Sequence, residues 1–392
     1  MEKTTNTVVF FVFHYINKVI FLIKRDKIMQ DKDKKKYFTA IVSETKEIPR
    51  LEVKQVKNCK YLKYGTDNLF PQYVFELYTH SSQFASIVDT MKDYIVGNGI
   101  VSGYPMKVVN RKGDTFDLFV EKLIIDYLLF GGFAFQVIRN KNKQIAEINW
   151  LDFRYIRINE DEDTIFYNKE WHNNRMQPKV YERYVNGEMQ TNSVFYYKGR
   201  QTRNQYPEPC YLAALTSIEI STQIPDYHLN NLTNGFHPSA IVNFNNGSNL
   251  PEDVMDEIEE AIQEKFSGTK NASRILLSFN DDMTHKTTIE RLPDDGSIDI
   301  YNSLKESTEK DIYTAFRISK LLMGDASDST GFNKQAYLES FALYNKTVIQ
   351  PIQKEIEDVV NNVLGEGSLH FEKFVVDWSE TGDSEDNSNI IE

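Results

Sequence analysis

The sequence predicts an α+β fold, and three observations lead to this prediction. Apolar residues recur at helical spacing in several segments, including 71–96 and 116–130, which indicates amphipathic helices. Between residues 133 and 197, short runs rich in β-branched and aromatic residues are separated by turn residues, which is typical of strands. Two further helical segments flank a small polar stretch at 325–333. With 392 residues, the chain is long enough for two or three domains.

The charge balance limits the kind of partner that the chain can hold tightly. The formal net charge is -12, whereas tight, sequence-independent binding to DNA needs many Lys and Arg side chains on phosphates. The chain has 25 Phe and 22 Tyr, which supply large apolar side chains for cores and subunit interfaces. Its only cysteines, Cys59 and Cys210, are too few for a disulfide framework, which favours a reducing compartment.

The N-terminal residues 1–36 are expected to form a disordered arm. The apolar run at 8–23 is interrupted by His14, Asn17 and Lys18 and is shorter than the roughly 20 residues that a spanning helix needs. Met29 is a possible true start, so residues 1–28 are expected to be dispensable and no membrane partner is expected. Insertion of 8–23 into a membrane remains the alternative.

Strands, a loop and two helical stretches are predicted in the first third of the chain. One or two strands are expected within 37–64, followed by a loop in which Asp67 or Asn68 is suited to cap a helix. The helix at 71–96 is expected to break in two at 80–82 and to end at Gly97-Asn98-Gly99.

The next segment predicts a helix followed by a series of strands. A helix at 116–130 should end at Gly131-Gly132. Asn186-Gly187 is a strong signal for a hairpin. The predicted strands are 133–139, 145–151, 155–158, 165–167, 180–185 and 194–197.

A β-α-β module is predicted at 237–293, between two long helices. The helix before it, about 211–235, contains Pro225, which should kink or divide it. Inside the module, the pattern predicts strands at 239–244, 274–279 and 287–292 and a helix that starts at Pro251.

A helix–loop–helix at 316–364 follows the module. The first helix ends at Leu322-Met323-Gly324, and the second carries Pro351 in its middle. Because proline has no N–H, the carbonyl of Thr347 should lose its partner and the long helix should bend there. A strand is expected within 365–378, and the acidic tail 379–392 is expected to be disordered.

Six segments, in this order, resemble the portal proteins of tailed bacteriophages. They are 131–135, 150–156, 206–209, 234–239, 267–276, and 322–325 with the helix that carries Pro351. Each is an ordinary helix stop or cap by itself, and the resemblance rests on their order and spacing across about 64–364.

The resemblance implies a portal fold with an α/β wing, a helical stem, a β-α-β clip and a long helix beside a channel loop. The implied divisions are wing 37–210, stem helices 211–236 and 294–323, clip 237–293, channel loop 324–334, long wing or crown helix 335–364 and C-terminal strand 365–378. The chain stops soon after Trp378, so a large helical crown is expected to be absent or minimal.

The same resemblance implies a function by assembly. Portal proteins form a ring, usually of twelve subunits, at one vertex of the capsid. Double-stranded DNA passes through the ring during packaging and ejection without sequence-specific binding. The implied partners are other copies of the chain, the major capsid protein, the large terminase and the head–tail adaptor. The implied location is the virion, with assembly in the host cytoplasm.

Candidate site residues follow from this placement. The residues expected to face DNA in the channel loop are Asp325, Ser327, Asp328, Ser329, Thr330, Asn333 and Lys334. The residues expected to dock partners at the clip are Glu252, Glu257, Glu260, Lys270 and Arg274. The expected helix kinks are at Pro225 and Pro351.

Catalytic and metal-binding patterns are weak in this sequence. It has no paired histidines of the zinc type, no Gly-rich phosphate loop with Lys and Ser or Thr, and no Gly-x-Ser-x-Gly elbow. Turn chemistry explains Asp281-Asp282 and Asp294-Asp295-Gly296. We therefore expect no catalytic residue, metal or cofactor. The alternatives are another structural or connector protein of the phage head, or a membrane-associated host protein.

Overall fold

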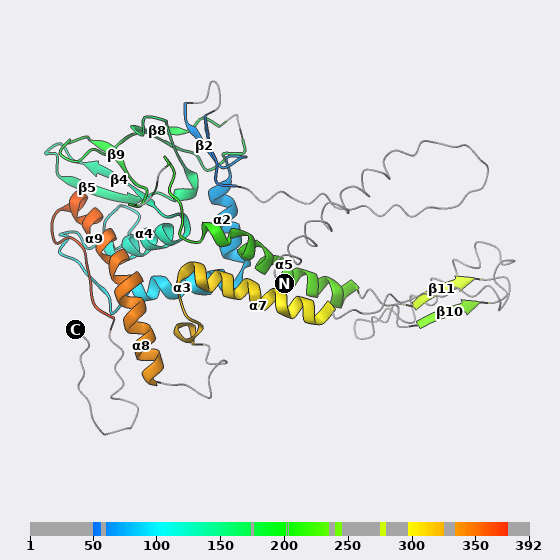
Figure 1. Cartoon of the computed structure of the whole chain (residues 1–392). Helices are drawn as coiled ribbons and strands as arrows, with labels where there is room; N and C mark the ends of the chain where they lie inside the picture. The colour runs from blue at the N-terminus through cyan, green and yellow to red at the C-terminus, as the bar shows by residue number, and fades with distance from the viewer. Residues whose placement is uncertain are drawn as a thin grey trace, which may run out of the picture. The chain divides into compact units, whose positions relative to one another are not determined.

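The computed structural model describes residues 50–55, 60–173, 176–200, 202, 204–234, 240–244, 275–279, 297–324 and 334–374. All of them belong to one of the two units into which the chain divides, residues 48–392. The mixture of helices and strands that the sequence predicts is confirmed (Figure 1). The predicted N-terminal arm at 1–36 and acidic tail at 379–392 lie outside the described residues. No helix of the described part combines the length and apolar character needed to cross a membrane.

The first two helices meet at a sharp break. Helix α2 spans Phe70–His80 and α3 spans Ser82–Val96, so the predicted interruption at 80–82 is confirmed. Ser81 lies between them in an extended conformation, and its Oγ accepts a hydrogen bond from the N–H of Phe84. A serine side chain that satisfies a free N–H of the first turn stabilises a helix start.

The predicted cap of α2 is wrong. The residue at the cap position is Leu69, and no side chain caps the helix. Asn68 instead has a positive φ of 67°, and its side-chain oxygen accepts a hydrogen bond from Arg157. Pro71 lies in the first turn and has no N–H, so one of the donors that a cap would satisfy is missing.

A six-stranded sheet has the strand order β5-β4-β9-β8-β7-β6. Its strands are β4 (Phe133–Arg139), β5 (Ile145–Trp150), β6 (Ile156–Ile158), β7 (Thr164–Tyr167), β8 (Lys179–Arg183) and β9 (Asn192–Tyr197). The strands predicted between residues 133 and 197 are therefore confirmed, with small changes at their ends. A separate antiparallel pair, β1 (Val53–Gln55) with β2 (Leu62–Tyr64), precedes α2.

The hairpin predicted at Asn186-Gly187 is wrong, because β8 and β9 pair in parallel. A turn does form there: Gly187 has a φ of 86° and the N–H of Glu188 donates to the carbonyl of Val185. The direction of β9 follows from its longer antiparallel pairing with β4, which extends from Phe133↔Tyr197 to Ile138↔Asn192. The six residue pairs between β4 and β9 therefore decide the direction of β9, and the turn preference of Asn186-Gly187 does not.

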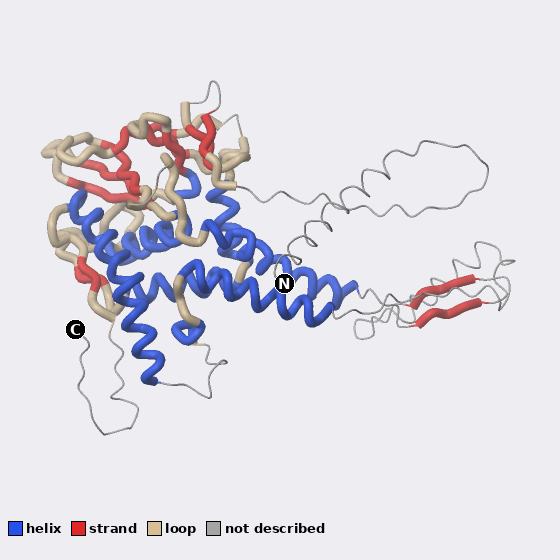
Figure 2. The backbone as a smooth tube through the Cα atoms, viewed as in Figure 1, coloured by secondary structure: helices blue, strands red, loops and turns tan. Residues whose placement is uncertain are grey.

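The core of the described body lies between the sheet and the helices. Helix α4 (Phe116–Phe130) has the predicted bounds, packs against β4 and β5, and also contacts α2 and α3 (Figure 2). Leu123 and Ile124 of α4 are fully buried. The helix ends at Gly131, whose φ of 79° is left-handed and therefore suits glycine.

Two long helices form an antiparallel pair. They are α5 (Leu215–Asn234) and α7 (Ser297–Phe316). Ser217, near the start of α5, donates to Asp311 near the end of α7 at 3.2 Å. Pro225 lies inside α5 but does not divide it, since the same helix continues to Asn234.

Strands β10 (Ala240–Phe244) and β11 (Ile275–Phe279) pair in parallel over five residues. Parallel strands need a crossover connection, which agrees with the predicted β-α-β order. The helix predicted to start at Pro251 and the strand predicted at 287–292 lie outside the described residues.

The long helix after residue 334 is interrupted, but not as predicted. It consists of α8 (Lys334–Tyr344), a π-helical turn (Asn345–Ile349) and α9 (Gln350–Leu364). Pro351 therefore lies in the first turn of α9, and the irregular turn precedes it. In a regular α-helix the proline ring would clash with the carbonyl four residues earlier, and a wider turn relieves that contact.

Candidate functional site

The polar segment between η4 (Lys320–Met323) and α8 is the candidate functional site. Its first residue, Gly324, ends η4 with a left-handed φ of 80°, and its last residue, Lys334, begins α8. The predicted DNA-facing residues between them, Asp325, Ser327, Asp328, Ser329, Thr330 and Asn333, lie outside the described residues. The structure therefore describes how the two ends of the segment are held.

One tyrosine contacts the chain on both sides of this segment. The hydroxyl of Tyr94, on α3, donates to the carbonyl of Leu322 at 2.8 Å and lies 3.2 Å from the hydroxyl of Tyr337 on α8. Burial raises the pKa of Tyr94 above its ordinary value, so its phenol stays protonated at neutral pH. The two ends of the segment are thus attached to a single side chain.

An aromatic cluster surrounds Tyr94 and orients α8. Its ring centroid lies 5.5 Å from Phe341, 6.3 Å from Tyr344 and 5.4 Å from Phe374. Such pairs contribute roughly 0.5–1.5 kcal/mol each beyond the area that they bury. The cluster joins α3, α8 and the residues after α9, and it forms the base at which both ends of the 324–334 segment lie.

Removal of the Tyr94 hydroxyl should destabilise this base without unfolding the chain. We expect Tyr94→Phe to lower the free energy of unfolding by about 1 kcal/mol, because the carbonyl of Leu322 loses a buried donor. Urea unfolding of the two proteins measures the difference. Tyr78→Phe is the matched control, since the hydroxyl of Tyr78 binds Asp89 at an exposed site. Equal losses in the two variants would contradict a special role for Tyr94.

The helix pair α5–α7 is joined to the same body by polar contacts. Glu309 of α7 accepts a hydrogen bond from Gln83 of α3 at 2.6 Å and lies 3.5 Å from the ammonium of Lys320. Glu219 of α5 accepts from the hydroxyl of Tyr73 at 2.7 Å. The contact between Glu309 and Lys320 therefore connects α7 with η4, which leads directly into the 324–334 segment.

Helix α9 is attached to both the sheet and α3. The hydroxyl of Tyr197 on β9 donates to Glu355 at 2.6 Å, and Arg200 lies 3.0 Å from Asp358. On another side, the amide of Gln353 donates to the carbonyl of Ile95 at 2.8 Å. The part of the long helix after the π-helical turn is thus held firmly to the body.

A buried arginine connects the α2 loop with the sheet, and the sequence analysis did not identify it. Arg157 of β6 is fully buried, and its guanidinium donates to Asn68 Oδ1 at 2.7 Å and to the carbonyl of Ile156 at 2.6 Å. It also lies 4.9 Å from the ring centroid of Trp171. Burial lowers the pKa of Arg157 to about 10, so the side chain remains charged at neutral pH. The sequence does not reveal this role, because alternation within β6 does not tell whether Arg157 lies on the buried or the exposed face of the sheet. Only the contacts in the folded chain show it.

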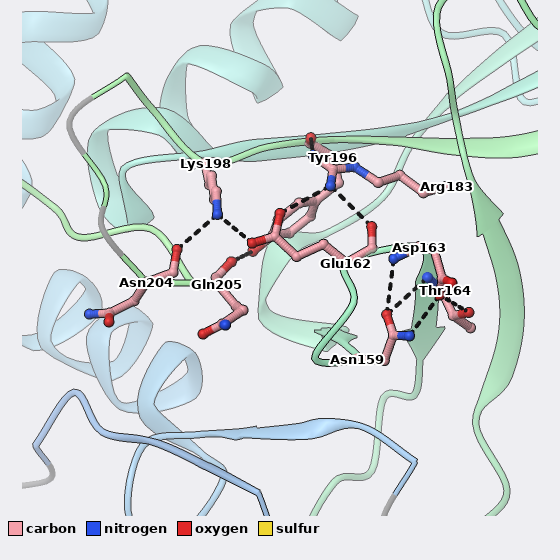
Figure 3. Close-up of polar contacts among 9 residues, drawn as sticks. All are labelled: Asn159, Glu162, Asp163, Thr164, Arg183, Tyr196, Lys198, Asn204 and Gln205. Carbon is pink, nitrogen blue, oxygen red and sulfur yellow. Dashed lines mark hydrogen bonds and ion pairs between the residues drawn. The ribbon is translucent and has the colours of Figure 1, made fainter.

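A second polar cluster ties the β6–β7 hairpin to the segment before α5 (Figure 3). The carboxylate of Glu162 accepts from Arg183 at 3.1 Å and from Lys198 at 2.5 Å. Lys198 also donates to the carbonyl of Asn204 at 3.0 Å, and the hydroxyl of Tyr196 donates to the carbonyl of Gln205 at 3.1 Å. The cluster fixes the path of the chain from the sheet toward the helix pair.

Helix α4 carries a buried carboxyl group. Asp126 is 3% exposed and accepts a hydrogen bond from Trp150 Nε1 at 2.8 Å. Burial, and secondarily the carboxylate of Asp152, raises the pKa of Asp126 well above its ordinary value. The folded chain therefore binds a proton more tightly at this site than the unfolded chain does.

This shift predicts a pH dependence of stability with a defined sign. Because the folded state keeps the proton to higher pH, Asp126 makes the free energy of unfolding fall as pH rises from about 4 toward neutral. We expect Asp126→Asn to flatten this decline, and urea unfolding between pH 5 and pH 8 measures it. Asp161→Asn, at an exposed position, is the control for the substitution itself. An unchanged slope in Asp126→Asn would contradict the assignment.

The other predicted site residues are placed only in part. Pro225 lies within α5 and Pro351 within α9. The predicted docking residues Glu252, Glu257, Glu260, Lys270 and Arg274 lie outside the described residues. Among the residues that the structure describes, no group of three or more His, Cys, Asp or Glu is arranged to hold a metal ion.

Comparison with known proteins identifies related sequences. A family model described as "Phage portal protein" matches residues 109–392. An uncharacterised protein of Rickettsia felis is 31% identical over 159 residues, which are 40% of this chain and 39% of that protein. This chain thus matches about two fifths of the length of that curated relative.

Solved structures with a similar fold come from gene transfer agent particles. A chain of the virion of the native particle matches with a TM-score of 0.51 and 14% identity, over 76% of this chain and 81% of that chain. A chain of the neck of the native particle, computed with C12 symmetry, matches with a TM-score of 0.50 and 13% identity, over 76% and 81%. At these identities the likeness concerns the fold.

Proposed function

This chain belongs to the phage portal protein family, and on that premise we propose that it assembles as a ring at one vertex of a phage head. The central channel of the ring passes double-stranded DNA during packaging and ejection. The match of the family model over residues 109–392 carries this proposal. Twelve subunits are proposed because the neck with the similar fold was computed with C12 symmetry.

Within such a ring, α5 and α7 are the proposed stem helices, and residues 324–334 are the proposed channel loop. The antiparallel pairing of the two helices and the common anchor of the loop ends at Tyr94 support this assignment. The loop residues proposed to face DNA are Asp325, Ser327, Asp328, Ser329, Thr330, Asn333 and Lys334. Their side chains, mostly small and polar and partly acidic, bind the phosphates of passing DNA only weakly.

The remaining parts take the roles that the family suggests. Residues 37–210 are the proposed wing, 335–364 the proposed long wing or crown helix, and 365–378 a strand beside the wing. Residues 237–293 are the proposed clip, where the large terminase and later the head–tail adaptor dock. Glu252, Glu257, Glu260, Lys270 and Arg274 are the proposed docking residues. The major capsid protein is the proposed neighbour at the vertex, with assembly in the host cytoplasm. No catalytic role is proposed.

The mass of the purified assembly tests the proposal. A closed ring of twelve chains, each of 45.7 kDa, should dominate in native mass spectrometry at micromolar concentration. Subunits that meet through unlike surfaces must either close into a ring or continue as a filament. A stable monomer or dimer at high protein concentration would show that the chain does not form a portal ring.

A further inference from the structure

A groove of about 650 Å³ lies where the β4–β5 turn, the segment after β8 and the last turn of α9 meet. Its lining includes five large apolar side chains, Tyr104, Met106, Ile145, Tyr184 and Met189. Met189 is 59% exposed, although methionine and tyrosine gain free energy when they are covered. The groove is therefore suited to an occupant with apolar side chains.

An arginine in the groove has an unused hydrogen-bond donor. Arg139 lines the groove, and its Nη1 donates to the carbonyl of Lys143 at 3.0 Å. Its Nε is buried and has no hydrogen-bond partner among the described residues. The guanidinium as a whole is only partly covered, so a carboxylate of an occupant can pair with its charge.

The surroundings of the groove are basic, although the chain as a whole is acidic. Exposed Lys107, Lys141 and Lys143 lie next in sequence to, or within, the segments that line it. Neither these three nor Arg139 is within ion-pair distance of a carboxylate in the part of the chain that the structure describes. Glu188, which lines the groove, and the exposed Glu366, next to the lining residue Gly365, oppose this positive charge only in part, since two acids face four basic side chains.

We infer that residues 375–392 of the same chain dock in this groove. This segment has six acidic residues, Asp377, Glu380, Asp383, Glu385, Asp386 and Glu392, and no Lys or Arg. It also contains Trp378 and Ile390-Ile391, which match the apolar lining. The charge of the segment is thus complementary to the groove, and its carboxylates can pair with the guanidinium of Arg139.

The distance that the segment must cover is compatible with its length. Gly367 lies beside Gly103, next to the groove residue Tyr104. The chain then pairs antiparallel with β3 (Ile100–Val101) at His370 and Phe371 and passes Gly97 at Phe374. Seven residues of extended chain cover roughly 23 Å, whereas the eighteen residues 375–392 span up to roughly 60 Å. Attachment to the same chain also gives the segment a millimolar effective concentration, which a copy free in solution does not have.

Photo-cross-linking of the full-length protein tests the inference. The exposed Met189 is replaced by p-benzoylphenylalanine, the protein is irradiated at low salt, and the cross-linked residues are identified by mass spectrometry. Val180, which is 60% exposed on β8 and does not line the groove, is the control position. We expect the Met189 position, but not the Val180 position, to cross-link to residues 375–392 within one chain.

Neutral variants show whether charge drives the docking. Glu385→Gln with Asp386→Asn should lower the cross-linking yield about fivefold, because two attractions to the basic rim are lost, and added salt should lower it further. Glu160→Gln with Asp161→Asn, an exposed acidic pair in the β6–β7 hairpin, should leave the yield unchanged. Cross-links between two chains would overturn the assignment to the same chain. A Met189 position that never captures residues 375–392 would overturn docking in this groove.

Discussion

Rings in which Asp325 and Asp328 are both replaced by Lys should assemble normally but package DNA poorly at low salt. Every subunit would add two ammonium groups to the channel and remove two carboxylates. These groups would hold the phosphates of the duplex as it passes, and the resulting drag should weaken as salt rises, because counterion release then favours binding less. We expect the packaging rate to fall at least about tenfold at low salt and to recover in large part at high salt.

Assembly should survive this change because the loop ends are held elsewhere. Tyr94 binds the carbonyl of Leu322 and contacts Tyr337, and neither contact involves residues 325–333. The measurement is the rate of DNA packaging by heads built with variant rings at two salt concentrations. Asp325→Asn with Asp328→Asn is the matched control, since it removes the acids without adding cations. Normal packaging by the double-Lys ring at low salt would show that residues 325–333 do not face DNA.

The second large effect is expected at Arg157. Replacement by Met should lower the free energy of unfolding by about 3–5 kcal/mol, because the oxygens of Asn68 and the carbonyl of Ile156 lose their buried donor. Arg157→Lys should recover only part of this loss, since an ammonium on a flexible stem does not reproduce the planar fork of donors.

Urea unfolding of the variants measures this effect. Arg200→Met is the control, because the ion pair of Arg200 with Asp358 is exposed and is screened by solvent. A loss in Arg157→Met no larger than that in Arg200→Met would contradict the role of Arg157 as the connection between β6 and the loop before α2.

Elements governed by local signals could be predicted from the sequence. Helix α4 begins and ends where its apolar spacing and Gly131 predict, and the break between α2 and α3 lies where His80-Ser81-Ser82 predicts. The hairpin at Asn186-Gly187 was predicted wrongly because distant pairing of β9 with β4 decides the direction of that strand. The interruption near Pro351 was predicted as a bend, whereas the structure has a π-helical turn before the proline.

The candidate site likewise has features that local sequence signals predict and features that depend on contacts between distant residues. The polar stretch at 325–333 between two helices is visible in the sequence, because its small side chains and glycine contrast with the apolar flanks. The anchor at Tyr94 is not visible, since 228 residues separate it from Leu322. Arg157 and Asn68 are 89 residues apart and likewise meet only in the folded chain. Contacts at such separations have no signature in local periodicity.

Electron microscopy of the purified assembly tests the central claim most directly. The portal assignment predicts closed rings with a central opening wide enough for duplex DNA, and class averages should show twelve-fold symmetry. In the same images, rings with Asp325 and Asp328 replaced by Lys should keep their diameter and symmetry. Particles without a central opening, or open filaments in place of rings, would contradict the assignment of this chain as a DNA channel.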